Sequence, residues 1–177
     1  HFGITTPLAA CHEHNERGEG GRFIRRLLAG EDVALISDAG TPLISDPGYH
    51  LVRYSRAAGI RVVPLPGACA LIAALCAAGL PSDRFIFEGF LPAKQAARLA
   101  RLEHLRAEPR TLIFYEAPHR ILAALGDLES VFGSDRPAVL GRELTKTFET
   151  LKDLPLGALR AWVESDANQQ RGECVLV

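Results

Sequence analysis

The sequence predicts an α/β protein of two domains, an N-terminal one built on a parallel sheet and a C-terminal one built on a mixed sheet. In the N-terminal part, segments with helical periodicity alternate with short apolar runs, and a glycine ends each helix. Short loops between such segments favour a parallel sheet with helices on its faces. In the C-terminal part, two strand-like runs follow one another directly, which predicts a mixed sheet.

The composition is that of an ordinary globular protein. The 177 residues are 47% hydrophobic and 23% charged, with a net charge of −1, so any contact with nucleic acid must come from a local patch. No apolar run approaches the roughly 18 residues of a membrane span, and we expect no membrane association. The four cysteines form no Cys-x-x-Cys pair, which favours buried thiols in a reducing cytoplasm over disulfides or zinc.

The predicted N-terminal domain covers residues 1–81 and ends in a turn cluster of glycine, proline and serine. Its expected strands are Thr6–Cys11, Val33–Ile36 and Ile60–Leu65. Its expected helices are Arg22–Ala29, Tyr49–Ala58 and an alanine-rich segment within 68–80.

The predicted C-terminal domain covers residues 82–177. Its expected strands are Phe85–Phe87, Arg110–Glu116, Pro137–Leu144, Phe148–Leu151 and Glu173–Val177. Its expected helices are Lys94–Ala107, His119–Phe132 and Leu156–Val163.

Three turns rich in small residues follow predicted strands and are candidates for a small-molecule site. They are Ser37–Pro42, Pro64–Ala68 and Glu116–His119. In open α/β sheets, ligands bind at the carboxyl ends of strands, because turn amides and helix N-termini converge there. No turn is a Gly-x-Gly-x-x-Gly or Walker loop, so a dinucleotide or a triphosphate has no motif support. Tight turns without a ligand are the alternative.

Two charged segments invite functional hypotheses. Between Lys94 and Arg110 there are five basic residues against two acidic ones, with Lys94, Arg98 and Arg101 on one helical stripe. This stripe is either a solvated helix face or a contact for an RNA phosphate backbone. Residues 142–149 form a second polar cluster, which either lines a cleft or is a salt-bridged sheet surface.

A metal site near the start of the chain is a weaker hypothesis. His12 and His14 would share one face of a strand, as a metal requires. No third ligand follows at a recognisable spacing, so a polar loop is favoured over a metal hydrolase.

Five motifs follow one another along the chain. They are Ser37–Gly48 (SDAGTPLISDPG), Pro66–Ala70 (PGACA), Glu88–Pro92 (EGFLP), Phe114–Arg120 (FYEAPHR) and Arg142–Glu149 (RELTKTFE). Together they resemble the tetrapyrrole methylase superfamily, and within it the members that 2′-O-methylate a cytidine of 16S ribosomal RNA. The resemblance implies S-adenosylmethionine as methyl donor, bound between two α/β domains, a homodimer, and 16S rRNA in the small ribosomal subunit as partner.

The resemblance also implies roles for individual residues. The superfamily's strand-end loops, carried to the matching positions, imply donor contacts at Asp38, Ala39, Gly40, Pro42, Gly67, Ala68, Cys69, Tyr115, Glu116 and Ala117. The basic residues expected to bind RNA are Lys94, Arg98, Arg101, Arg120 and Arg142. A ribose hydroxyl needs a general base, which typically contributes about 10²–10⁴-fold. The candidates are Glu143, Lys146 (which would need a lowered pKa) and His12.

The rRNA-methylating members begin with a strand and a Thr-Pro-Ile-Gly-Asn-Leu-type loop that nothing here matches. We therefore expect the chain to be the middle of a longer enzyme. Two other functions stay open: methylation of a tetrapyrrole carbon, and RNA binding without catalysis.

Overall fold

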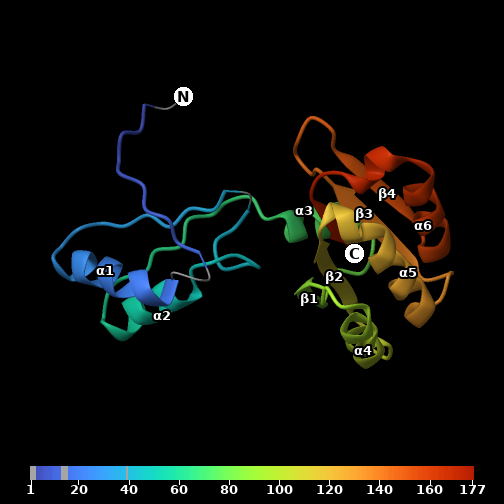
Figure 1. Ribbon diagram of the computed structural model, residues 1–177, viewed down its shortest axis with the longest axis horizontal. Coiled ribbons are helices and arrows are strands. Elements are labelled where there is room, and N and C mark those ends of the chain that lie inside the picture. The colour runs from blue at the N-terminus through green and yellow to red at the C-terminus, as the bar shows by residue number, and fades with distance from the viewer. Residues whose placement is uncertain (1–2, 13–15, 39) are drawn as a thin grey trace. The chain divides into compact units, whose positions relative to one another are not determined.

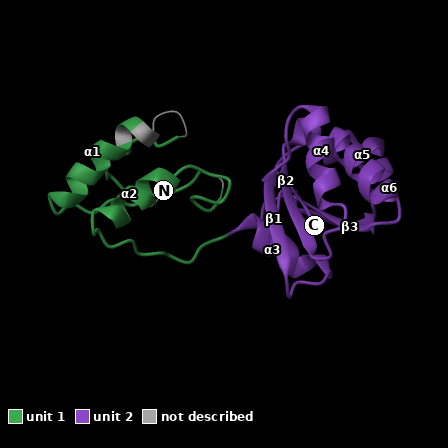
Figure 2. Ribbon diagram, turned by 90° about the horizontal axis from the view of Figure 1, so that it is seen from below, with its two compact units in different colours: residues 1–68 green, residues 69–177 purple. Residues whose placement is uncertain are grey.

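The computed structural model describes residues 3–12, 16–38 and 40–177. The chain forms two compact units, residues 1–68 and residues 69–177, which Figure 2 colours separately. Among the described residues, no helix is both long and apolar enough to cross a membrane.

Unit 2 is built on a five-stranded sheet with the order β1-β2-β5-β3-β4 (Figure 1). The strands are β1 (Phe85–Phe90), β2 (Thr111–Glu116), β3 (Pro137–Arg142), β4 (Thr150–Pro155) and β5 (Cys174–Leu176). β1 and β2 run parallel, and every other neighbouring pair is antiparallel. The predicted mixed sheet is confirmed, with the last strand of the chain inserted in its middle.

Helices cover both faces of this sheet. They are α3 (Ala70–Ala78), α4 (Gln95–Leu105), α5 (Ile121–Phe132) and α6 (Leu156–Ser165), with short 3₁₀ turns η1 (Pro118–Arg120) and η2 (Ala167–Gln170). The first lies on one face and the other three lie on the opposite face (Figure 1).

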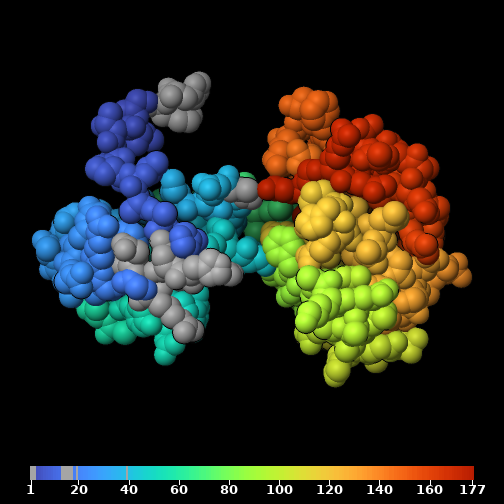
Figure 3. Space-filling view, viewed as in Figure 1, coloured from blue at the N-terminus to red at the C-terminus, as the bar shows by residue number. Residues whose placement is uncertain are grey.

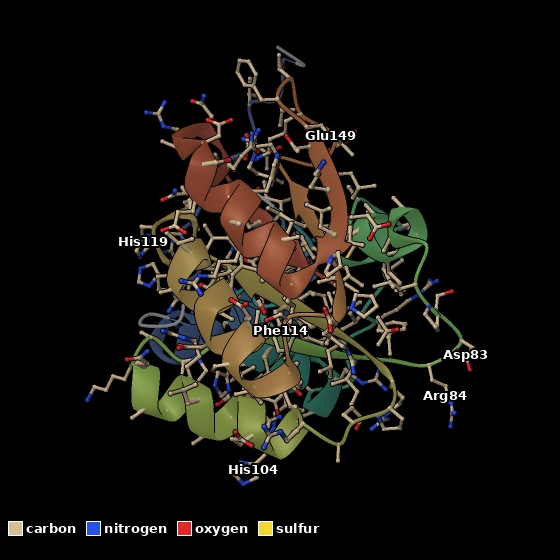
Figure 4. The ribbon with its side chains drawn as sticks, turned by 90° about the vertical axis from the view of Figure 1, so that its right-hand side faces the viewer. Asp83, Arg84, His104, Phe114, His119 and Glu149 are labelled. Atoms are coloured by element: carbon tan, nitrogen blue, oxygen red, sulfur yellow. The ribbon has the colours of Figure 1, made fainter. Side chains whose placement is uncertain are left out.

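The core follows from strand alternation, because successive side chains of a strand point to opposite faces. Phe114 of β2 packs with Leu102 and Leu125 on the face of α4, α5 and α6. Its neighbour Ile113 packs with Leu75 of α3 on the other face. Figure 4 shows Phe114 in the centre of unit 2, with His104 pointing outward from α4.

A buried ion pair joins α4 to α5. Arg98 Nε lies 2.6 Å from Asp127 Oδ2, and the two side chains are 5% and 8% exposed. Gln95 donates a further hydrogen bond to this carboxylate, while Arg98 Nη1 donates to the carbonyls of Pro92 and Ala93. A guanidinium can be buried only when its donors find acceptors, and this network supplies them.

Unit 1 contains the helices α1 (Glu16–Leu28) and α2 (Tyr49–Ala57), which lie side by side in Figure 1. Phe23 of α1 and Leu51 of α2 are buried, and Gly20 of α1 lies beside the Tyr54 ring of α2, where a Cβ would make an ordinary van der Waals contact at 3.5 Å. The helix α2 matches the predicted one to within one residue, whereas α1 begins six residues before the predicted start at Arg22.

The prediction of strands in the N-terminal part is wrong. In the described part of unit 1 there is no strand, and Thr6–Cys11, Val33–Ile36 and Ile60–Leu65 have no ladder partner. Ile36 and Leu65 are accordingly 70% and 85% exposed. A strand exists only when a neighbouring strand takes its N–H and C=O groups, and an apolar sequence cannot supply that neighbour.

The alanine-rich helix belongs to unit 2, because α3 packs on its sheet and the two units divide between Ala68 and Cys69. The domain boundary at 81/82 stays a prediction.

We expect Arg98→Ala to lower the free energy of unfolding by about 3–5 kcal/mol, because Asp127 would keep a buried charge without a counter-ion. Urea denaturation measures the change. The control is Arg106→Ala, which removes a pair with Glu103 whose side chains are 60% and 50% exposed; its effect should stay below about 1 kcal/mol. Equal effects of the two variants would contradict a special role for the buried pair.

Candidate functional site

In unit 1, a hydrogen bond joins two of the three turns predicted to hold a ligand. Thr41 Oγ1 donates to the carbonyl of Ala68 over 2.7 Å, across 27 residues of sequence. Thr41 was not among the predicted site residues. The signal that could have indicated it is a hydroxyl side chain between two predicted site residues, Gly40 and Pro42. The first two small-residue turns are thus brought together without a sheet between them.

The 40–48 loop has an unusual backbone. Leu43 and Ser45 adopt positive φ angles of 72° and 54°. At Gly48, φ is 127°, and a Cβ would lie 2.6 Å from Leu35 and 2.9 Å from Leu43. Only glycine fits here, so the entry to α2 depends on this position. Backbone strain of this kind occurs most often at functional sites.

The other predicted residues of unit 1 are accessible. Asp38, Gly40, Gly67 and Ala68 are exposed, and Pro42 is partly buried. Ala39 lies outside the described residues. These small residues are therefore accessible to solvent, and their contact with a ligand stays a prediction.

In unit 2, Tyr115 connects the carboxyl end of β2 to the start of α3. Its hydroxyl accepts a hydrogen bond from the amide of Leu71, two residues after Cys69, over 3.1 Å. Its ring makes edge contacts with Phe87 and Phe90, with centroids 4.8 and 5.8 Å away. Burial raises the pKa of the Tyr115 hydroxyl, so it stays protonated at neutral pH. Phe90 is 52% exposed, which leaves an aromatic surface at this edge.

Glu116 points to the opposite face of the sheet from Tyr115. Its side chain is fully buried; Oε1 accepts from the Ala117 amide over 2.7 Å and pairs with Arg120 over 2.5 Å. Glu116 Oε2 and Arg120 Nε are buried and have no hydrogen-bond partner in the described part of the chain. Such orphaned polar atoms are rare, and each calls for an explanation such as a water or a ligand.

The predicted catalytic residues Glu143 and Lys146 lie together. Lys146 Nζ is 3.0 Å from Glu143 Oε1 and 2.8 Å from Glu173 Oε2. The Glu173 amide and then Lys146 lower the pKa of the Glu143 carboxyl. Hydrogen bonds to Glu173 and Glu143 raise the pKa of Lys146. At neutral pH the pair is therefore a carboxylate and an ammonium, and Lys146 lacks the lowered pKa that a general base needs.

Arg142 holds the loop that carries these residues. It is 8% exposed and donates to the carbonyls of Phe148 and Arg171, to the Thr150 hydroxyl and to Gln169. Figure 3 shows this 143–149 loop in orange, standing out from the surface of unit 2, and Figure 4 places Glu149 there. Arg142 thus donates four hydrogen bonds within its own chain, and the phosphate contact predicted there stays a prediction.

The other basic residues predicted to bind RNA are also mostly paired. Arg98 is buried against Asp127, and Arg120 pairs with Glu116. Arg101 forms two hydrogen bonds with Glu88, of 2.8 and 2.9 Å. Of the predicted set, Lys94 is the exposed one with no ion pair among the described residues. Sequence spacing correctly placed the stripe on a helix but could not show carboxylates from other elements.

No group of three or more His, Cys, Asp or Glu residues that could hold a metal is present in the described part of the chain. Of the two histidines predicted to form a metal site, His12 is among the described residues and His14 lies outside them.

Cys174 lies between Glu116 and Arg142 in the strand register, and burial raises its pKa to about 11. Thiol alkylation needs the thiolate, so Cys174 should stay unmodified by iodoacetamide at pH 8, whereas the exposed Cys76 reacts. Peptide mass spectrometry measures both. Labelling of Cys174 at the rate of Cys76 in the folded protein would refute the burial described here.

The fold and these strand-end loops define an α/β protein of the tetrapyrrole methylase class. Residues 3–160 match the family of tetrapyrrole (corrin/porphyrin) methylases. The chain therefore belongs to this family.

Among its relatives are proteins named ribosomal RNA small subunit methyltransferase I. The one from Pseudomonas aeruginosa is 75% identical over 177 residues, which are 100% of this chain and 63% of the relative. Those from Xylella fastidiosa (strain Temecula1) and Haemophilus influenzae are 62% and 57% identical over the whole chain, covering 65% and 62% of their lengths. The chain thus spans less than two thirds of these relatives.

Solved structures support the same fold. The methyltransferase CobJ aligns with a TM-score of 0.68 at 19% identity, over 100% of this chain and 76% of that one. The cobalt precorrin-4 methyltransferase CbiF aligns with a TM-score of 0.60 at 14% identity, over 90% of this chain and 69% of that one. At these identities the likeness concerns the fold alone.

Proposed function

We propose that the protein transfers a methyl group from S-adenosylmethionine to the ribose 2′-hydroxyl of a cytidine in 16S ribosomal RNA, as a homodimer in the cytoplasm. The observation that carries this proposal is the 75% identity, over the whole chain, to a protein named ribosomal RNA small subunit methyltransferase I. The resemblance of the five motifs supports the cytidine and the 2′-oxygen.

Each unit, taken by itself, offers groups suited to a part of the proposed donor. When bound, S-adenosylmethionine supplies a methyl group on a positively charged sulfur. In unit 1, Asp38 offers a carboxylate for an ammonium or a ribose, and the loops joined by Thr41 and Ala68 offer exposed backbone. In unit 2, the rings of Phe90 and Tyr115 offer an aromatic surface suited to an adenine. The remaining donor contacts named from the sequence are part of the same proposal.

In this proposal, Glu143 and Lys146 promote methyl transfer through their positions and their charges. In-line displacement at a methyl carbon gains most of its rate from holding the two reactants in line. The Glu143 carboxylate accepts the proton of the attacking 2′-hydroxyl, while the Lys146 ammonium holds Glu143 in place and stabilises negative charge on the oxygen. The 143–149 loop is suited to this, because its geometry is held by Arg142 before any substrate binds.

A second candidate function is methylation of a tetrapyrrole carbon, which the match of residues 3–160 to the tetrapyrrole (corrin/porphyrin) methylases favours. A transfer assay with labelled S-adenosylmethionine separates the two functions. We expect label in small ribosomal subunits that lack the modification and none in a porphyrinogen. Label in the porphyrinogen alone would replace the first function by the second.

The hydrogen bond from Thr41 to the Ala68 carbonyl, which joins two loops of unit 1, gives a test of donor binding. Thr41→Val keeps the shape of the side chain and removes the hydroxyl, so the loops lose one hydrogen bond of about 1 kcal/mol. We expect the donor Kd from calorimetry to rise about fivefold. Thr41→Ser keeps the hydroxyl and should bind like the parent protein. An unchanged Kd in Thr41→Val would separate these loops from the donor site.

A further inference from the structure

The exposed side of α2 carries a basic and aromatic stripe that the sequence analysis did not single out. Tyr49, Arg53 and Arg56 are spaced by four and three residues, which places them on one side of a helix. All three are exposed, Tyr49 by 58%. Leu51 and Ser55 are buried on the opposite side of the helix. The stripe is therefore not a packing surface of unit 1.

The positive charge of this stripe is not neutralised by the chain itself. α2 contains no acidic residue, and Arg61 follows it on an exposed segment. In the described part of the chain, Arg53, Arg56 and Arg61 have no carboxylate within ion-pair distance. Arg56 and Arg61 also line one shallow hollow, together with Gly59, Ile60 and Val62.

The arginines of α4 and the segment after it differ in this respect. Arg101 pairs with Glu88, Arg106 with Glu103 and Arg110 with Glu108. A phosphate would have to displace a carboxylate from each of them, whereas it would meet Arg53, Arg56 and Arg61 without such competition. Electrostatic binding of RNA depends on cations that exchange small counter-ions for phosphates.

We propose that Arg53, Arg56 and Arg61 form a contact surface for the phosphate backbone of the RNA substrate, with Tyr49 beside them for a ribose or a base. This surface, named the α2 surface here, rests on the proposed function and adds the place where RNA is held. Exposed aromatic rings next to arginines are typical of surfaces that bind single-stranded RNA, because bases stack on the rings while phosphates meet the cations.

The test measures binding of a small-subunit ribosomal RNA transcript to the protein as a function of salt. Each phosphate contact contributes a slope of about 0.7–0.9 in log K against log salt, and thus about a five- to eightfold gain at 0.1 M relative to 1 M salt. In the double variant Arg53→Gln, Arg56→Gln, two phosphate contacts are lost. We expect the magnitude of the salt slope to fall by about 1.4–1.8, and the Kd for RNA at 0.1 M salt to rise about 25- to 60-fold.

A matched control removes the same charge elsewhere. Arg106→Gln with Arg110→Gln lowers the net charge equally, but removes arginines that are already paired. We expect its slope to stay within about 0.3 of the parent's, since no phosphate contact is lost. Arg53→Lys with Arg56→Lys keeps the charge and should recover most of the affinity. Donor binding by calorimetry and the urea midpoint report that the variants are folded.

The outcomes separate this inference from the proposed function. An unchanged slope in the glutamine variant of α2, while the parent protein binds RNA, would overturn the α2 surface and leave the methyltransfer proposal standing. An equal loss in the control variant would also overturn it, because the effect would then come from net charge. A parent protein that binds no RNA in these assays would overturn both.

Discussion

The buried guanidinium of Arg142 is the interaction on which the site-bearing edge of unit 2 depends. A guanidinium has five N–H donors and cannot lose its charge, so its burial requires acceptors from several directions. β4, the loop before it and the segment that precedes β5 supply them. Arg142 therefore joins the loop that follows it and the start of β4 to a segment 27 to 29 residues away in sequence.

This network makes a strained loop stable. Glu143 and Thr145 have positive φ angles of 49° and 65°, and such conformations cost about 1–3 kcal/mol each for residues other than glycine. Lys146 binds Glu143 and Glu173, and Glu149 accepts from the Thr145 amide, so the loop is held at both ends and in the middle. Gly172 lacks a Cβ where the Glu143 side chain packs. A preorganised carboxylate and ammonium are what a polar transfer reaction at this loop would need.

Internal pairing also decides which positive charges face a partner. The stripe on α4 has the spacing of an RNA-binding helix, yet its arginines are neutralised by carboxylates of β1 and α5 that lie 13 and 29 residues away. The arginines of α2 have weaker sequence patterning, and no carboxylate of the described residues pairs with them. A basic sequence pattern counts charges, whereas binding depends on the charges that remain after the chain has folded.

The sequence by itself determined most of each helix, the mixed sheet of unit 2 and the family, because these depend on local periodicity and ordered motifs. The strands expected at Val33–Ile36 and Ile60–Leu65 failed for the opposite reason, since a strand requires a partner that the segment does not encode. The tertiary structure alone decided that Arg98 and Arg142 are buried, that Glu116 faces away from Tyr115, and that Thr41 reaches Ala68. Each of these depends on contacts between residues distant in sequence, and spacing along one segment carries no information about them.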